Sequence, residues 1–174
     1  MTVQDWLRPG LITMVIILNW KSGMDGDLRF SMAQEDVLEH RGRLVFLFLI
    51  LAQGAHSIEE YATRLYLVFP PARFVSSLVS HDLAVGFLFV NSALAAFGLW
   101  CWAVPIRSNW PVARGLVWFW ILLELGNGIG HLFLALWHGG YFPGVATAPL
   151  LLLFAGWLAV LQARQAGRSS VLPS

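Results

Sequence analysis

Residues 44–64 read LVFLFLILAQGAHSIEEYATR and join an apolar run to a charged one without a break. The first nine residues are typical of a helix that crosses a membrane. His56, Glu59 and Glu60 follow within the same run. An ionised side chain in the hydrocarbon of a bilayer is costly, and such residues usually face the interior of a helix bundle and mark functional sites. These three residues therefore predict partners elsewhere in the chain.

The composition indicates an integral membrane protein. Of the 174 residues, 57% are hydrophobic and 12% are charged, with a mean hydropathy of +0.66, whereas soluble domains average about 25% charged residues. We predict an all-α, polytopic transmembrane helix bundle. The net charge of +1 offers no basic surface for a nucleic acid, and the single cysteine, Cys101, excludes a disulfide within the chain.

Four apolar segments are long enough to be predicted as membrane spans. Prolines or glycines follow three of them, at Pro70-Pro71, Pro105 and Gly139-Gly140. The predicted spans are residues 44–69, 83–104, 112–137 and 146–162.

The N-terminal apolar stretch LITMVIILNW, residues 11–20, is too short to cross, because a crossing helix needs about 20 residues. We expect an interfacial or re-entrant helix, with a full additional span as the alternative. No small-residue cleavage site follows it, which argues against a signal peptide. The predicted organisation is an N-terminal helix and surface segment (1–43), the bundle (44–163) and a polar tail (164–174).

The basic residues predict the orientation in the membrane, since cytoplasmic loops are rich in Lys and Arg. On the side where the first span begins lie Lys21, Arg29, Arg41, Arg43, Arg107, Arg114, Arg164 and Arg168. On the other side lie only Arg64 and Arg73, with Arg8 left out because the N-terminal segment is not assigned to a side. We therefore expect both termini in the cytoplasm, with the bacterial plasma membrane as the location.

The polar residues of the first span share one helix face. His56, Glu59, Glu60 and Thr63 are spaced i, i+3, i+4 and i+7, and Gln53 extends this face by one turn. One of the two glutamates is expected to turn outward or to pair with Arg64.

The third span has a matching face. Glu124, Asn127 and His131 are spaced i, i+3 and i+7. The first and third spans run in the same direction, and both polar sets lie roughly 18–28 Å from the cytoplasmic boundary at about 1.5 Å per residue. We therefore predict that side chains of His56 or Glu60 approach those of Glu124, Asn127 or His131 within about 6 Å.

Such a cluster has three chemical uses. Carboxylates and imidazoles suit zinc, iron or manganese, and the predicted ligands are His56, Glu60, Glu124 and His131, with Asn127 orienting one of them. Without a metal, a glutamate and a histidine can transfer protons. A satisfied hydrogen-bond network that only stabilises the bundle is the third use. Haem held by two histidines is not favoured, and no C-x-x-C-H attachment motif is present.

Three motifs resemble the HXXEE family of small polytopic membrane proteins. H-x-x-E-E corresponds to residues 56–60, N-x-x-x-H to Asn127 and His131, and Y-x-P-G to residues 141–144. The resemblance extends from about residue 45 to about residue 160. It implies a helical bundle in which the three motifs converge, with Tyr141, Pro143 and Gly144 capping the site or lining its mouth. It implies no particular reaction.

These observations favour an intramembrane enzyme, with or without a metal, that acts on a lipid or another apolar small molecule. The alternative is a non-catalytic accessory subunit of a larger membrane complex, in which the polar cluster is structural. The candidate catalytic residues are His56, Glu59, Glu60, Glu124, Asn127, His131 and Tyr141.

Overall fold

The computed structural model describes residues 37–169, and within this range the chain forms helices and turns without any strand. The all-helical fold predicted from the sequence is therefore confirmed. The N-terminal helix predicted at residues 11–20 and the end of the polar tail lie outside the described residues.

Helix α2 spans His40–Ala62 and holds the first polar face. It ends earlier than the predicted boundary at Phe69, because Arg64 adopts a left-handed conformation with φ of 57°. A short helix, α3 (Leu65–Val68), follows. Pro70 and Pro71 then begin helix α4 (Pro70–Val79), in the first-turn positions that proline favours. The helical segment that precedes this pair ends at Val68, as predicted, and the pair also begins a new helix.

Helix α5 spans Leu83–Cys101 and begins at a well-formed cap. The Asp82 carboxylate accepts hydrogen bonds from the backbone N–H groups of Ala84 and Val85. At its other end the chain continues as a π-helical segment, η2 (Trp102–Ile106), which contains Pro105. Proline has no N–H to donate to the preceding turn, so this change in winding at Pro105 is expected.

Helix α6 spans Ala113–His138 and helix α7 spans Ala148–Ser169. Gly139 ends α6 in a left-handed conformation with φ of 70°, the usual glycine cap. The predicted third span is thus confirmed within one or two residues. Helix α7 extends past the predicted end at Gln162, so the first residues of the predicted polar tail are helical.

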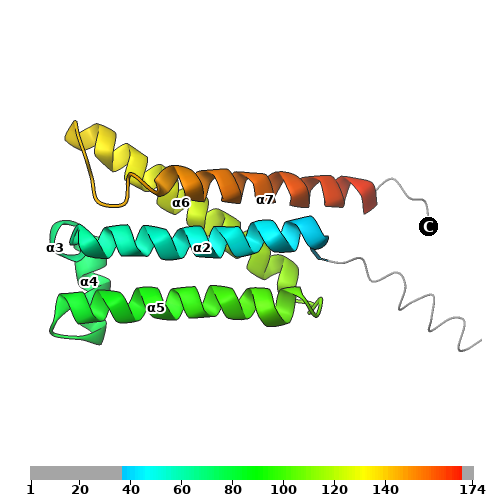
Figure 1. Ribbon diagram of the computed structural model, residues 1–174, viewed down its shortest axis with the longest axis horizontal. Coiled ribbons are helices and arrows are strands. Elements are labelled where there is room, and N and C mark those ends of the chain that lie inside the picture. The colour runs from blue at the N-terminus through cyan, green and yellow to red at the C-terminus, as the bar shows by residue number, and fades with distance from the viewer. Residues whose placement is uncertain (1–36, 170–174) are drawn as a thin grey trace, which may run out of the picture. The chain divides into compact units, whose positions relative to one another are not determined.

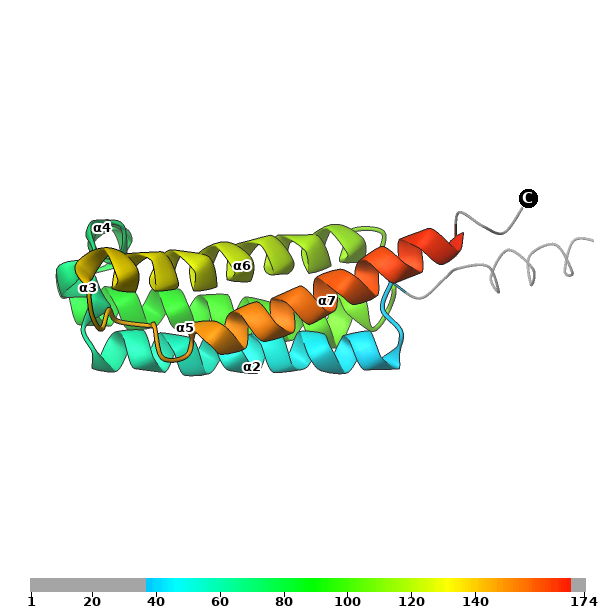
Figure 2. The same cartoon turned by 90° about the horizontal axis from the view of Figure 1, so that it is seen from above.

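The four long helices lie side by side and alternate in direction. Helices α2 and α6 run one way, and α5 and α7 run the other way (Figures 1 and 2). The parallel direction of α2 and α6 puts the C-terminal half of each at the same end of the bundle, as the sequence predicted. Helices α3 and α4 and the turn between α6 and α7 also lie at this end.

The opposite half of the bundle is apolar, and we call it the core half. It is organised around Trp120, which is fully buried and packs edge-to-face on Phe46 at 6.4 Å between ring centroids. Gly98 of α5 lies so close that an added Cβ would meet Ile50 and Trp120 at 2.7 Å and 3.0 Å. The other buried members are Leu38, Val45, Leu49, Cys101, Ile106, Ala113, Val117, Ile121, Ala155 and Leu158.

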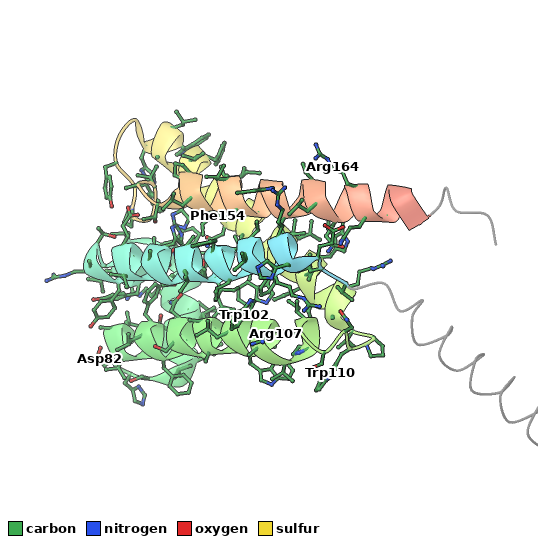
Figure 3. All side chains as sticks on the ribbon, turned by 45° about the vertical axis from the view of Figure 1, so that its right-hand side comes forward. Asp82, Trp102, Arg107, Trp110, Phe154 and Arg164 are labelled. Carbon is green, nitrogen blue, oxygen red and sulfur yellow. The ribbon has the colours of Figure 1, made fainter. Side chains whose placement is uncertain are left out.

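Labelled side chains mark the two ends of the bundle (Figure 3). Asp82 lies at one end, while Arg107, Trp110 and Arg164 lie towards the other. Near that second end, the Arg107 guanidinium covers the Trp102 ring at 5.5 Å from its centroid.

Three helices of the described chain are long and apolar enough to cross a membrane: Leu83–Ile106, Ala113–His138 and Ala148–Ala166. Four such spans were predicted. Helix α2 is long enough at 23 residues, but its carboxylates, arginines and histidines make it more polar than the other three. The structure therefore supports an integral membrane protein with three clear spans rather than four.

Candidate functional site

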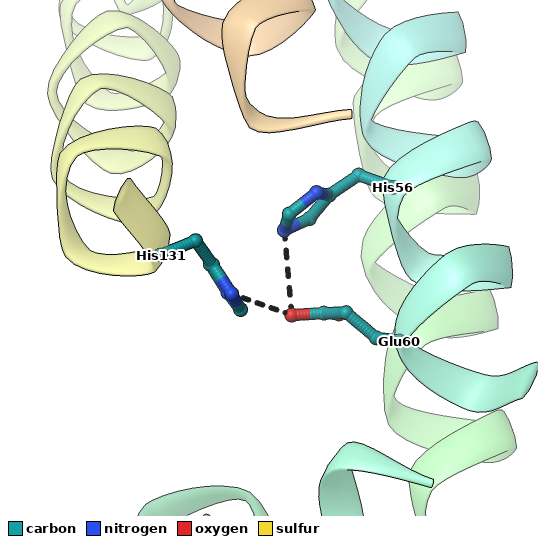
Figure 4. A group of neighbouring side chains, drawn as sticks. All are labelled: His56, Glu60 and His131. Carbon is teal, nitrogen blue, oxygen red and sulfur yellow. Dashed lines mark ion pairs between the residues drawn. The ribbon is translucent and has the colours of Figure 1, made fainter. Parts of the chain in front are cut away.

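Three buried side chains from the two predicted faces meet between α2 and α6 (Figure 4). Glu60 Oε1 lies 3.3 Å from His56 Nε2 and 3.0 Å from His131 Nε2. The exposed fractions of His56, Glu60 and His131 are 0%, 6% and 5%. Their ligand atoms lie within 4.8 Å of one another, a spacing that a single metal ion can bridge. The predicted approach of the two helix faces is thus observed.

His131 is oriented by the turn after α6. Its Nδ1 lies 2.5 Å from the carbonyl oxygen of Pro143. A carbonyl only accepts hydrogen bonds, so Nδ1 donates and carries the proton. The other ring nitrogen, Nε2, then directs its lone pair at Glu60 when the imidazole is neutral.

His56 is oriented by a chain of two hydrogen bonds. Thr147 Oγ1 donates to the Glu59 carboxylate at 2.5 Å, and its hydrogen is therefore used. The same oxygen lies 2.8 Å from His56 Nδ1, so this nitrogen donates to it. His56 Nε2 is consequently also a lone-pair nitrogen in the neutral ring, and it is buried without a hydrogen-bond donor.

Glu59 fastens the α6–α7 turn to α2. Its carboxylate accepts from the Tyr141 hydroxyl at 2.6 Å, from Ala146 N–H at 3.1 Å and from Thr147 N–H at 2.8 Å. The expectation that one glutamate turns outward or pairs with Arg64 is corrected, because Glu59 and Glu60 both point to protein partners, one to the turn and one to α6. Partial desolvation raises the pKa of the Tyr141 phenol, and the adjacent Glu59 raises it further, so Tyr141 remains a donor at neutral pH.

Gly144 lets this turn approach both histidines. Its φ is +90°, and a Cβ at this position would lie 2.6 Å from His131 Nδ1 and 2.8 Å from His56 Cε1. Only glycine combines this backbone conformation with this close contact. The Y-x-P-G motif is thus explained residue by residue: a hydroxyl for Glu59, a carbonyl for His131, and space for both rings.

Glu124 lies apart from the three-residue group. Although it was predicted as a fourth ligand, it does not belong to the set of described residues whose ligand atoms converge. It is fully buried beside Gln53. When the Gln53 amide is oriented so that both its oxygen and its nitrogen have partners, its NH₂ group donates to the two Glu124 carboxyl oxygens at 3.2 Å and 2.8 Å. The seven-residue step from Glu124 to His131 corresponds to about 10 Å along a helix, which explains the separation.

Asn127 was predicted to orient one of the four ligands. It lies 3.4 Å from Gln53 and hydrogen-bonds to Glu124, so among the predicted ligands it contacts Glu124, which lies outside the three-residue group. The groups that orient the imidazoles are Thr147 and Pro143. Thr147 was not among the predicted site residues, because a single threonine at the start of a span is also an ordinary helix-start residue.

A cavity of about 550 Å³ adjoins the site and connects the two polar groups. Glu60 and His131 line one part of its wall, and Glu124 and Asn127 line another. Most of the remaining wall is apolar. Leu122, which is 64% exposed, also lines it, so the cavity reaches the lateral surface of the bundle.

No curated protein and no solved structure matches this chain. The family model described as "Protein of unknown function with HXXEE motif" matches residues 46–158, more than half of the chain and the whole of the site described above. The chain therefore belongs to the HXXEE family, as its three motifs had indicated.

Proposed function

We propose that this protein is an integral membrane enzyme in which His56, Glu60 and His131 hold a divalent metal ion beside a cavity for an apolar substrate. The observation that carries the proposal is the orientation of two imidazole Nε2 atoms towards one carboxylate oxygen. With both Nδ1 atoms protonated, three electron-rich atoms face one another in a buried space. Such an arrangement needs a shared cation, either a metal ion or an added proton.

The surroundings of the two rings favour the metal over the proton. Histidines that bind metals usually donate their second ring N–H to a carbonyl, a carboxylate or a similar acceptor, which fixes the tautomer and the ring orientation. His131 does so to Pro143, and His56 does so to Thr147 and through it to Glu59. Two imidazoles and a carboxylate suit zinc, iron and manganese.

Three protein ligands leave a coordination position for a substrate or a water molecule, as catalytic zinc sites do. Glu60 and His131 line the cavity, so this position can be reached from it. When bound, such an ion polarises an oxygen of the substrate or lowers the pKa of a water molecule. The protein supplies the apolar wall that excludes bulk water and the Glu59–Thr147–His56 chain that keeps the ring in place.

The membrane orientation is also part of the proposal. Helix α2 is taken as a fourth crossing, with both termini in the cytoplasm and the α6–α7 turn outside. Among the described lysines and arginines, Arg64 and Arg73 are alone near the site end, while six arginines lie towards the other: Arg41, Arg43, Arg107, Arg114, Arg164 and Arg168. This distribution supports the orientation.

Cysteine labelling in intact cells tests the orientation. Gly140 is exposed in the turn, and no atom lies within 4 Å of an added Cβ, so Gly140→Cys is compatible with the fold. Native Cys101 is buried and gives little background. We expect an impermeant thiol reagent to label the variant in intact cells. Labelling only after lysis would show that the chain has the opposite orientation.

Comparison of membrane extracts tests the enzymatic function. We expect organic extracts from membranes with the wild-type protein to contain a product that is lacking with Glu60→Gln, a variant that keeps the shape of the side chain and removes its charge. A chelator should abolish the product and added metal should restore it. A product that depends on Glu60 but resists chelation would indicate metal-free acid–base catalysis. Identical extracts, with other polypeptides co-purifying, would indicate a non-catalytic accessory subunit instead.

A further inference from the structure

The cavity contains a second polar group, which the metal centre does not use. Glu124 is fully buried and Gln53 is 3% exposed, and both line the cavity together with Asn127. The chain continues through the Ser57 hydroxyl, which lies 3.2 Å from Gln53 and 2.9 Å from Asn91 Oδ1. Burying this many polar atoms among apolar helices is costly unless each has a partner.

The charge of the cavity wall restricts the ligands that it can bind. Two carboxyl groups, Glu60 and Glu124, line the wall, and no Lys or Arg is among the described lining residues. At the Glu124 end, away from the proposed metal, a fatty-acid carboxylate or a phosphate headgroup would meet no cationic side chain of the described lining in a region of low dielectric constant, so anions are disfavoured there. A pure hydrocarbon would form no hydrogen bond with the Gln53 and Asn127 amides or with the Glu124 carboxyl group.

We infer that the cavity binds a neutral apolar alcohol, with its hydroxyl group at Glu124 and Asn127 and its apolar body extending towards the metal centre. A hydroxyl both donates and accepts hydrogen bonds. It can therefore donate to a carboxyl oxygen of Glu124 and accept from an amide N–H of Asn127 or Gln53. A ketone or an ester only accepts, so it matches half of this arrangement.

The dimensions of the cavity agree with this ligand. A volume of about 550 Å³ lies within the range of roughly 300–1,000 Å³ that is typical of small-molecule sites. Glu124 and His131 are separated by about two helical turns, or roughly 10 Å. This inference rests on the proposed function in one respect, the place of the reaction on the substrate. The atoms that react at the metal lie roughly 10 Å from the hydroxyl group of the substrate.

The route to the cavity is lateral. Leu122 and Val75 line the cavity and are 64% and 41% exposed. Gly126, one turn from Leu122, is also exposed and lines the cavity, and an added Cβ there meets no atom within 4 Å. A large side chain at residue 126 should therefore block the cavity without moving the metal ligands.

Photolabelling of the full-length protein in lipid bilayers tests the inference. The probe is a long-chain primary alcohol with a diazirine on its chain, and the competitors are the unmodified alcohol, the corresponding fatty acid and the corresponding alkane. We expect the alcohol alone to compete. Gly126→Phe should reduce labelling by about tenfold or more, which corresponds to about 1.4 kcal/mol. Gly130→Phe is the matched control, because Gly130 lies on the same helix with no atom near its Cβ and does not line the cavity.

Variants of Glu124 separate recognition of the hydroxyl group from a general defect. Glu124→Gln keeps hydrogen-bonding groups and should retain the preference for the alcohol, whereas Glu124→Leu should remove this preference while still admitting the chain. Equal competition by the fatty acid or the alkane in the wild type would overturn the inference. Unchanged labelling in Gly126→Phe would do so as well.

Repeating the labelling after removal of metal distinguishes this inference from the proposed function. Labelling that persists in metal-free protein supports binding at Glu124, as expected. If the purified protein binds no metal and still selects the alcohol, the metal proposal fails and this inference stands. Labelling that disappears with the metal would place the hydroxyl group at the metal and contradict the inference.

Discussion

The core half and the site half of the bundle are stabilised in different ways. In the core half, aliphatic and aromatic side chains pack around Trp120. In the site half, hydrogen bonds connect Glu59, Thr147 and His56, and Glu60 Oε1 approaches the Nε2 atoms of His56 and His131. Apolar packing has no direction and depends on volume, whereas each polar contact requires a particular atom at a particular angle. Substitutions in the core half should therefore change stability, and substitutions in the site half should change metal binding.

Truncation of Trp120 is expected to have the largest effect. Trp120→Ala should destabilise the bundle by about 3–5 kcal/mol, as truncation of large core residues does. The folded fraction should bind metal as the wild type does, because residue 120 lies outside the site. Thermal unfolding in detergent, with metal content measured on the folded fraction, checks both outcomes. Trp157→Ala is the control, because Trp157 is 50% exposed and should have little effect. Loss of metal from folded Trp120→Ala would show that the two halves are not separable.

Substitution of Gly144 should affect both stability and metal binding. Gly144→Ala places a methyl group against both imidazoles at a φ of +90°, a backbone strain of about 1–3 kcal/mol. We expect a lower unfolding temperature together with weaker metal binding. Gly140→Ala in the same turn is the matched control, because its Cβ meets no atom within 4 Å. If the two variants behave alike, the turn does not contact the histidines as described.

Removal of the Thr147 hydroxyl should weaken metal binding with little effect on the fold. Thr147→Val breaks the link between Glu59 and His56 Nδ1, and loss of such an outer contact typically costs about 10–100-fold in metal affinity. Thr63→Val is the control, since the Thr63 hydroxyl donates to the backbone carbonyl of Glu59 instead. Titration of metal-free protein gives the affinities. Equal affinities for the two variants would show that the Thr147 hydroxyl does not contribute to metal binding.

Loss of the Tyr141 hydroxyl should have the smallest effect. Tyr141 is 60% exposed and contributes one of four donors to Glu59. Tyr141→Phe should therefore cost about 1 kcal/mol or less. The affinity for metal should fall by only a few-fold, because Thr147 still donates to Glu59. A loss as large as that in Thr147→Val would mean that the phenol takes part in the site directly.

The sequence predicted the meeting of His56, Glu60 and His131 because helical periodicity and depth are both encoded locally. It could not predict which polar residues belong to which group. Glu124 shares a helix face with His131 but lies two turns away. Whether the Glu124 side chain reaches the group of His56, Glu60 and His131 depends on the packing of α2 against α6.

The helix ends could likewise be predicted only where a local sequence signal marks them. Gly139 is a local signal, and the helix end that it predicts is found. The break at Arg64 has no such signal, since arginine rarely adopts a positive φ. It is explained only by the tertiary structure, in which α3 and α4 fold back beside α5. The apolar length of residues 44–69 therefore suggested one continuous helix where there are two.

Metal content tests the central claim of a His–Glu–His metal centre most directly. Elemental analysis of the purified wild-type protein, before and after incubation with zinc, iron or manganese, should give about one ion per chain, as expected for a single site with three protein ligands. His131→Ala should reduce this to background, while His81→Ala, which changes an exposed histidine outside the group, should leave it unchanged. A wild-type protein that takes up none of these metals, or a His131→Ala variant that retains its metal, would contradict the claim.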